Sequence, residues 1–551
     1  MAVRAWWRGA VIYQIYPRSF SDSNGDGIGD LRGITQRLDH VAALGVDAIW
    51  VSPFFASPMK DFGYDVSDYC AVDPSFGSLA DFDALLARAH ALGLKVIIDQ
   101  VWSHTSDQHK WFADSRARVD AAKSDWYVWA DPRPDGTPPN NWLSVFGGGA
   151  WSWEPRRRQY YLHHFLPSQP QLNLRNPAVW DALLEVASFW LDRGVDGFRL
   201  DAVDYLFHDD RLLDNPPRPT ADGEIPVKPF RLQRHVHDMM RPETLPAFER
   251  IRAFMDHYPG VATLGEVSSE PGSVERCGRY TAGDGRLNMA YTLGLLKHEF
   301  SAAFVRDAIA EAEAANQDGW LCWALGNHDV ERVVSRWTDN HPTDDFARLV
   351  MALLVSLRGS VCVYQGDELG LAEAELPYAA LRDPYGIAFY PEFRGRDGCR
   401  TPMPWRADVP HAGFSTAAQP WLPVPDAHRA RAVDRQDRDP ASVLNGWRRL
   451  LAWRKRQPAL IEGDLRLIDL PDSLVGFERR TERQRLLAVF NLSDRPVTVS
   501  GLLQPGLRAL DGHGFDHEAR GADVILPAHG VWFAEDQTVA AAPPRVLAPV
   551  E

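Results

Sequence analysis

Four short apolar runs, far apart in the sequence, each end at a carboxylate, and this pattern restricts the possible folds more than any other feature. The runs are VIIDQVWSH (96–104), GFRLDAVD (197–204), TLGEV (263–267) and WALGNHD (323–329). A buried parallel strand reads as a continuous apolar run, and α/β barrels hold functional side chains at the carboxyl ends of such strands. The pattern therefore predicts parallel strands whose acidic ends meet at one site.

Strand-like and helix-like segments alternate along most of the chain. The eight candidate strands are 11–16, 48–53, 95–100, 197–202, 262–267, 287–291, 321–329 and 361–368. Helical patterns lie between them, such as 79–93 with its apolar face and 176–194, which opens with Asn-Pro as cap and first position. Eight strands separated by helices predict an α/β fold, a (β/α)8 TIM barrel, with an open doubly wound sheet as the alternative.

Two regions depart from this alternation and predict further domains. Residues 103–174 are rich in Trp, Pro and Gly and too long for an ordinary loop, so we expect an excursion domain after the third strand. The catalytic barrel then comprises 1–102 and 175–460. Residues 461–551 contain short alternating runs with turn residues between them, which predicts a C-terminal antiparallel β-sandwich domain.

The composition indicates which class of partner and which cellular compartment to expect. The net charge is −15 with acids and bases interspersed, which argues against nucleic acid or an anionic membrane and favours a small neutral molecule. Five cysteines without a CxxC pair indicate neither a disulfide framework nor a zinc site, and we expect buried thiols in a reducing compartment. The N-terminus lacks a signal-peptide core, and the longest apolar run, 349–357, is too short to span a bilayer. We expect a cytoplasmic protein.

The acids at the strand ends suggest a chemistry. Arg199 and Asp201 lie two apart on a strand and so point to the same side, where the arginine is expected to lower the pKa of Asp201, as a carboxylate nucleophile requires. A structural Arg–Asp pair is the alternative. Glu266 on the next strand suits a general acid, and Asp329 adds a third carboxylate. Three acids around one opening favour a reaction that develops positive charge, such as glycoside cleavage.

The loop 22–30 (DSNGDGIGD) reads as a metal site. Oxygen ligands fall at positions one, three, five and nine, namely Asp22, Asn24, Asp26 and Asp30, and a glycine at position six permits the tight turn of a calcium loop. Position twelve is Gly33 rather than glutamate, so the loop is a shortened relative of the EF-hand. A Gly/Asp-rich turn without an ion is the alternative.

These motifs together resemble the α-amylase family, glycoside hydrolase family 13. The likeness covers DQVWSH, GFRLDAVD, GEV and NHD, and it extends to IYQIYPRSFSDSNGDGIGD, GYDVSDY, QPQLN and RTPMPW. The opening segment and RTPMPW resemble the α-glucosidase and oligo-1,6-glucosidase branch. The resemblance implies a barrel with an excursion domain after strand three, a C-terminal β-sandwich and a retaining double displacement.

The resemblance also implies a role for each matching residue. Asp201 corresponds to the nucleophile, Glu266 to the acid and then base, and Asp329 to the residue that holds the sugar hydroxyls and stabilises the transition state. Positions that grip the terminal glucose are matched by Asp65, His104, Arg199, His328 and Arg400, with Tyr64 as the stacking platform. Asp99 is expected to orient Arg199. The Ile28 carbonyl joins the metal ligands, which implies a structural Ca²⁺ or Mg²⁺.

Linkage preference depends on the residue after the nucleophile, at the leaving-group subsite. In related enzymes a valine there accompanies α-1,6 substrates; this chain has Ala202, and its QPQLN segment lacks an acid in the middle, so α-1,4 is favoured. We expect an exo-acting α-glucosidase for short oligosaccharides or glucosides, able to pass glucose to an alcohol acceptor. A sucrose- or trehalose-converting transglucosidase, an oligo-1,6-glucosidase and a non-catalytic barrel relative are the alternatives.

Overall fold

The computed structural model describes residues 5–220, 226–316, 318–339 and 341–538. Eight strands close into a barrel in the order β1-β13-β12-β11-β10-β9-β5-β2, and every neighbouring pair is parallel. The strands are β1 (Val11–Ile15), β2 (Ala48–Val51), β5 (Lys95–Gln100), β9 (Gly197–Leu200), β10 (Ala262–Glu266), β11 (Met289–Tyr291), β12 (Leu321–Ala324) and β13 (Ser360–Tyr364). The predicted barrel is thus confirmed and the open sheet is excluded.

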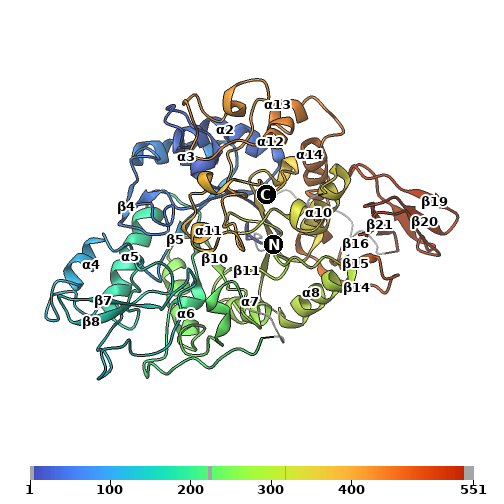
Figure 1. Ribbon diagram of the computed structural model, residues 1–551. Helices are drawn as coiled ribbons and strands as arrows, with labels where there is room; N and C mark the ends of the chain where they lie inside the picture. Colours follow the sequence, from blue (N-terminus) through green and yellow to red (C-terminus); the bar gives the residue numbers. More distant parts are fainter. Residues whose placement is uncertain (1–4, 221–225, 317, 340, 539–551) are drawn as a thin grey trace, which may run out of the picture.

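Helices connect and follow the barrel strands in the sequence, and most of them surround the barrel (Figure 1). They are α1 (Pro17–Phe20), α2 (Leu31–Leu44), α3 (Leu79–Ala91), α4 (Lys110–Ser115), α5 (Pro177–Leu191), α6 (Thr244–Met255), α7 (Ser273–Thr281), α8 (Ala302–Ala315), α9 (Val333–Arg336), α10 (Asp344–Ser356), α11 (Pro384–Phe389), α12 (Asp426–Ala430), α13 (Val433–Gln436), α14 (Val443–Arg454) and α15 (Pro458–Glu462). The Asn176 side chain caps α5, and Pro177 takes its first position as predicted. Within the described residues, no helix has the length and apolarity needed to cross a bilayer.

The inside of the barrel is packed and not hollow, because apolar side chains from alternate strands fill it. Trp50, Ile97, Leu264, Met289 and Tyr291 belong to this inner cluster and are at most 1% exposed. A filled interior leaves the carboxyl ends of the strands, rather than a central channel, as the place for a site.

The chain leaves the barrel between β5 and β9, as the sequence predicts. This excursion contains the sheet β6 (Trp129–Ala130), β8 (Gln159–Leu162) and β7 (Trp151–Glu154), with Trp142 buried in its core. The Trp142 indole nitrogen donates to the Leu213 carbonyl (2.9 Å), in the loop that follows β9. The excursion and that loop therefore form one continuous wall beside the mouth of the barrel. The hairpin of β3 (Phe55–Ala56) and β4 (Asp68–Val72) lies between β2 and α3.

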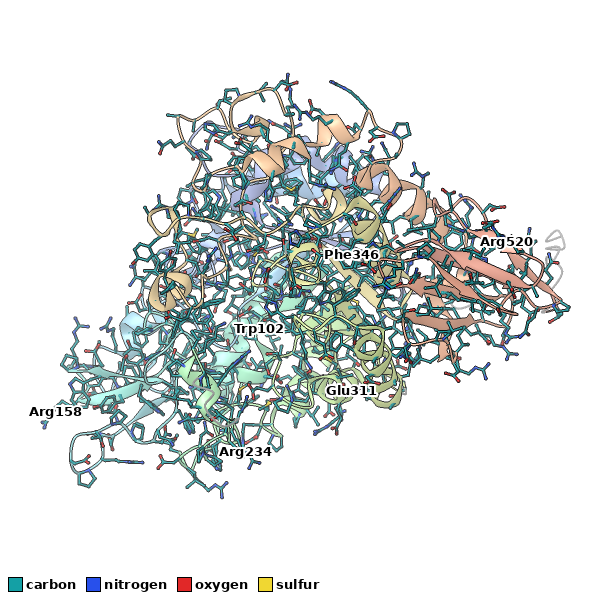
Figure 2. The ribbon with its side chains drawn as sticks, turned by 45° about the vertical axis from the view of Figure 1, so that its right-hand side comes forward. Trp102, Arg158, Arg234, Glu311, Phe346 and Arg520 are labelled. Carbon is teal, nitrogen blue, oxygen red and sulfur yellow. The ribbon has the colours of Figure 1, made fainter. Side chains whose placement is uncertain are left out.

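The C-terminal region forms two antiparallel sheets. One contains β14 (Asp464–Leu467), β15 (Leu474–Arg480), β16 (Arg485–Asn491), β21 (Val531–Asp536) and β18 (Leu507–Ala509); the other contains β17 (Val497–Val499), β20 (Asp523–Leu526) and β19 (Glu518–Arg520). Trp532 of the first sheet and Leu526 of the second pack in one core that the two sheets share. Figure 2 shows Arg520 in this domain and Arg158 in the excursion on opposite sides of the molecule.

Candidate active site

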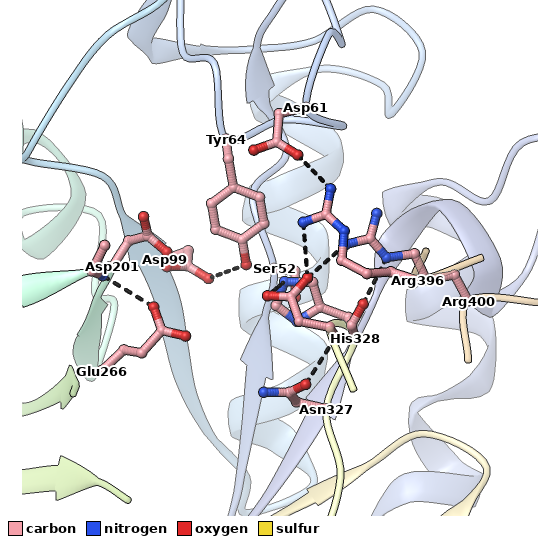
Figure 3. Close-up of polar contacts among 12 residues, drawn as sticks. Ser52, Asp61, Tyr64, Asp99, Asp201, Glu266, Asn327, His328, Arg396 and Arg400 are labelled. Carbon is pink, nitrogen blue, oxygen red and sulfur yellow. Dashed lines mark hydrogen bonds and ion pairs between the residues drawn. The ribbon is translucent and has the colours of Figure 1, made fainter. Parts of the chain in front are cut away.

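The structure brings the three predicted carboxylates together. Asp201 follows β9, Glu266 is the last residue of β10 and Asp329 follows β12, and all three line one cavity of about 1120 Å³ at the carboxyl end of the barrel. Figure 3 shows Asp201 and Glu266 beside each other. β12 itself ends at Ala324, earlier than expected, because the chain turns at 325–329, where the Asn327 side chain accepts from the Asp329 backbone N–H (2.8 Å). The turn aims Asp329 into the cavity.

Arg199 connects Asp201 and Glu266 through ion pairs. Its Nη1 donates to Asp201 (2.6 Å) and to Asp99 (2.8 Å), and its Nη2 pairs with Glu266 (2.7 Å). The guanidinium is 1% exposed and does not line the cavity, so it bridges the two carboxylates instead of gripping the sugar. Asp99 orients Arg199 as expected, and Trp50 donates to the other Asp99 oxygen (3.0 Å).

The protonation of the acid pair differs from the sequence-based expectation. Burial raises the pKa of Asp201 to about 7, although Arg199 acts in the opposite direction, so the predicted lowering of this pKa is wrong. Burial also raises the pKa of Glu266 to about 7, with a further increase from the charges of Asp201 and Asp329. The two groups titrate as a pair and hold a proton near neutral pH. One carboxylate and one acid at adjacent positions are what a nucleophile and a general acid require.

Asp329 stays ionised beside this pair. Although burial alone would raise its pKa, the neighbouring His328 and the charges of Arg396 and Arg400 hold the pKa of Asp329 well below its usual range. Arg396 Nη1 lies 3.1 Å and Arg400 Nη2 2.7 Å from the same Asp329 oxygen. Asp329 therefore presents a fixed negative charge to whatever occupies the cavity.

Asp61 and Arg396, which the sequence did not single out, form the wall opposite the acid pair (Figure 3). Arg396 Nη2 pairs with Asp61 (2.9 Å) and with buried Asp383 (2.8 Å), and both Asp61 and Arg396 line the cavity. Asp61 stands three residues before Tyr64, just outside the GYDVSDY segment. Arg396 lies in the aperiodic loop after β13, where the sequence gives no positional signal.

Like Arg199, two further residues predicted to grip the sugar, Asp65 and Arg400, do not line the cavity. Asp65 is fully buried and accepts from Ser57 Oγ (2.9 Å) and from the backbone N–H groups of residues 60 and 61. Its carboxylate therefore holds the loop that carries Asp61. Arg400 is 1% exposed and donates to the His328 carbonyl (2.6 Å), so it supports Asp329 from behind.

Aromatic and histidine side chains complete this wall. The ring of Tyr64 lines the cavity and stacks on His328, with centroids 5.3 Å apart and planes inclined by 3°. His328 thus lies behind the platform. His104 lines the cavity, and burial lowers its pKa to about 3, which keeps the imidazole neutral. Gln169 of the QPQLN segment donates to Asp61 (3.1 Å) and also lines the cavity.

Several aromatic side chains also line the cavity. Ala202 lines it and has a left-handed backbone (φ 47°), which directs its N–H to Glu266 Oε2 (3.1 Å). Further lining residues are Phe146, Phe165, Tyr205, Lys228, Tyr385 and Phe393. The Phe165 ring contacts His104 (centroids 5.1 Å apart), and the Arg396 guanidinium lies 5.2 Å from the centroid of the Phe146 ring. Lys228 Nζ lies over the ring of Phe393, 3.7 Å from its centroid, in a cation–π contact. Loops from three parts of the sequence therefore meet at this cavity.

The loop 22–30 folds into consecutive turns held by its own side chains. Asp22 accepts from the backbone N–H groups of residues 24, 25 and 27, and Asp30 caps α2 by accepting from the Gly33 N–H (2.7 Å). Its oxygen ligands suit a hard cation, but Ser415 also donates to Asp22, so a cation would have to replace some of these donors. In the described ranges, no group of three or more His, Cys, Asp or Glu is arranged to hold a metal.

Comparison with known proteins agrees with this geometry. Residues 14–463 match the family described as alpha amylase, catalytic domain. A probable α-glucosidase of Rhizobium meliloti (strain 1021) is 55% identical over 537 residues, covering 96% of this chain and 97% of the relative. Among solved structures, the α-glucosyl transfer enzyme XgtA has a TM-score of 0.93 at 55% identity, over 97% of this chain and 100% of that one. The trehalulose synthase MutB from Pseudomonas mesoacidophila MX-45 has a TM-score of 0.86 at 32% identity, with the same coverage.

Proposed function

This chain belongs to the α-amylase family of glycoside hydrolases, and from that premise we propose that it is an exo-acting, retaining α-glucosidase. It releases α-glucose from the non-reducing end of short α-glucosides. The observation that carries the proposal is the meeting of Asp201, Glu266 and Asp329 in one cavity, with Arg199 bridging the first two. No simple structural role calls for three carboxylates that face one opening.

The reaction proceeds in two displacements. The Asp201 carboxylate attacks the anomeric carbon while Glu266 donates its proton to the departing glycosidic oxygen, which gives a glucosyl ester on Asp201 and a free alcohol. Glu266, now ionised, then takes a proton from water, and the hydroxide attacks the same carbon and releases Asp201. Asp329 stays charged throughout and stabilises the oxocarbenium-like transition states.

Recognition of a chain end follows from the wall that contains Asp61 and Arg396. Their ion pair and the Gln169 amide present charged and polar groups at hydrogen-bonding distance of one another, suited to the hydroxyls of a terminal sugar. The Tyr64 ring offers a flat apolar surface for the sugar ring. These groups bind one terminal glucose, which supports exo action.

The α-1,4 linkage is favoured by the small side chain of Ala202 at the leaving-group side. The rings of Tyr205 and Phe165, which pack in one cluster with Ala202, would reduce the access of water there and so favour transfer of glucose to an alcohol acceptor alongside hydrolysis. The names of XgtA and MutB, a glucosyl transfer enzyme and a trehalulose synthase, keep a sucrose-converting transglucosidase as the second candidate.

Product analysis on maltose, sucrose and isomaltose tests the assignment. We expect glucose release from maltose to be fastest. Glucose release from sucrose but not from maltose would favour the transglucosidase, and a preference for isomaltose would favour an oligo-1,6-glucosidase. No cleavage of any α-glucoside would refute the proposed function.

We further propose a structural Ca²⁺ or Mg²⁺ in the loop 22–30. The side chains of Asp22, Asn24, Asp26 and Asp30 and the Ile28 carbonyl would hold it, and its charge would stabilise the turn that leads into α2. A cytoplasmic location is our proposal too. Its support is that all five cysteines are free thiols.

A further inference from the structure

Asp204 is a fully buried carboxylate close to the catalytic pair that the proposed reaction does not use. It lies three residues after Asp201, is 0% exposed and does not line the cavity. A buried charge is unfavourable unless donors surround it. The position of these donors indicates what Asp204 does.

The donors to Asp204 come from the segments that follow β10. One oxygen accepts from the Ser268 backbone N–H (3.0 Å), from Ser268 Oγ (2.7 Å) and from Arg276 Nε (3.3 Å), and the other accepts from the Tyr280 hydroxyl (2.6 Å). Ser268 lies two residues after Glu266, and Arg276 and Tyr280 belong to α7. Asp204 therefore ties the chain after the nucleophile to the chain after the general acid.

Between Asp201 and Asp204 lies a residue in a disfavoured conformation. Ala202 has φ 47° and ψ 47°, a left-handed backbone that residues with a Cβ seldom adopt unless their surroundings impose it. The chain is held on both sides of it. The Asp201 N–H donates to the Gln100 carbonyl (2.9 Å), and the Asp204 carbonyl accepts from the Met240 N–H (2.7 Å). This conformation gives the 3.1 Å contact between the Ala202 N–H and Glu266.

We propose that Asp204 is a positioning residue that sets the distance and orientation between Asp201 and Glu266. It does so by anchoring the turn at Ala202 to Ser268 and α7. The inference rests on the proposed retaining mechanism, in which those two side chains must reach opposite sides of one bond. Asp204 touches neither the substrate nor the reacting atoms.

A matched control lies at the other end of the same strand. Asp196 precedes β9, is 9% exposed and accepts from His90 Nε2 (2.7 Å), Lys95 Nζ (2.7 Å) and the Val96 N–H (2.9 Å). It is as well supplied with donors as Asp204 but faces away from the site. A purely structural buried carboxylate should behave like Asp196.

The test uses the full chain with Asp204→Asn, Tyr280→Phe and Asp196→Asn, assayed for kcat and KM on p-nitrophenyl α-glucoside over a range of pH. Asp204→Asn should lower kcat by about 10- to 100-fold with KM changed little, because misplacement of reacting groups affects the chemical step. Tyr280→Phe retains the charge of Asp204, so it reports geometry alone. In Tyr280→Phe the hydrogen bond from the Ala202 N–H to Glu266 should loosen, which raises the pKa of Glu266. The alkaline limb of the kcat/KM profile of this variant should therefore move to higher pH. Asp196→Asn should lower the melting temperature and leave both readouts unchanged.

Each outcome decides the proposal. A folded Asp204→Asn with wild-type kcat, or a loss of kcat no larger than that of Asp196→Asn, would overturn it. Should Asp204→Asn not fold, Tyr280→Phe decides, and a wild-type kcat and alkaline limb in that variant would overturn the proposal. An inactive wild-type protein would instead refute the proposed function, so the two failures are distinguishable.

Discussion

At the amino end of β9, Asp196 is matched by two basic side chains and a backbone N–H, whereas at the carboxyl end Arg199 serves Asp99, Asp201 and Glu266 at once. The first arrangement supplies three donors to a single carboxylate. The second leaves acids in excess, and burial raises the pKa of Asp99 to about 6 and that of Asp201 and Glu266 to about 7. The two ends of one strand thus separate charges that stabilise the fold from charges that the fold must hold in place.

The largest effect should come from removing the nucleophile at the carboxyl end. Asp201→Asn keeps the shape of the side chain but cannot form a glucosyl ester, so kcat on p-nitrophenyl α-glucoside should fall by about 10⁴-fold or more. Asp196→Asn at the amino end should keep its kcat. A comparable loss in both variants would erase the contrast between the two ends.

A second prediction separates two acids at the same end of the barrel. Asp61 lines the cavity and Asp65 lies behind it, so Asp61→Asn should lower kcat/KM by about 100-fold through lost contacts to sugar hydroxyls. Asp65→Asn should mainly lower the melting temperature, with a smaller effect on kcat/KM. Steady-state kinetics and thermal melts on both variants give the comparison. A larger loss of kcat/KM in Asp65→Asn than in Asp61→Asn would assign the contact with the sugar hydroxyls to Asp65.

A third prediction concerns stability as a function of pH. Carboxyl groups in the unfolded chain titrate near about 4, below the folded pKa of about 7 for Asp201 and Glu266. Between these values the folded protein binds more protons, so the free energy of unfolding falls as pH rises from about 4 to about 7. Glu266→Gln removes one such group. It should melt about 2 to 4 °C above the wild type at pH 8 and match it near pH 4.5.

The control for this prediction is again Asp196→Asn, which removes a well-paired charge and should melt below the wild type at pH 8. Thermal melts followed by circular dichroism at both pH values provide the measurement. If Glu266→Gln melts below the wild type at pH 8, as Asp196→Asn should, the prediction is wrong. The ionised carboxylates at the carboxyl end of β9 would then not destabilise the fold.

The smallest predicted effect belongs to the loop 22–30. Removal of divalent cations with EDTA should lower the melting temperature by about 1 to 3 °C, and added Ca²⁺ should restore it, because an ion would bind only the folded state. Asp26→Ala should abolish this response. An unchanged melting temperature with no heat of Ca²⁺ binding in calorimetry would assign the loop to an ion-free turn.

Much of the barrel could be predicted from the sequence because buried parallel strands read as apolar runs, whatever surrounds them. The same runs located Asp201, Glu266 and Asp329. Arg396 could not be found in this way, since it reaches the site from an aperiodic loop through contacts with Asp61 and Asp383 that only the folded chain creates. The direction of the pKa shift of Asp201 could not be predicted either. The sequence shows the neighbouring arginine, which lowers this pKa, but not the burial of the carboxyl group, which raises it.

The most direct test of the central claim is to trap the covalent intermediate. Incubation with 5-fluoro-α-glucosyl fluoride should add one fluoroglucosyl group to the intact protein, and peptide mapping should place it on Asp201, with no adduct in Asp201→Asn. A wild type that turns over α-glucosides without this adduct, or that first releases β-glucose, would contradict the account.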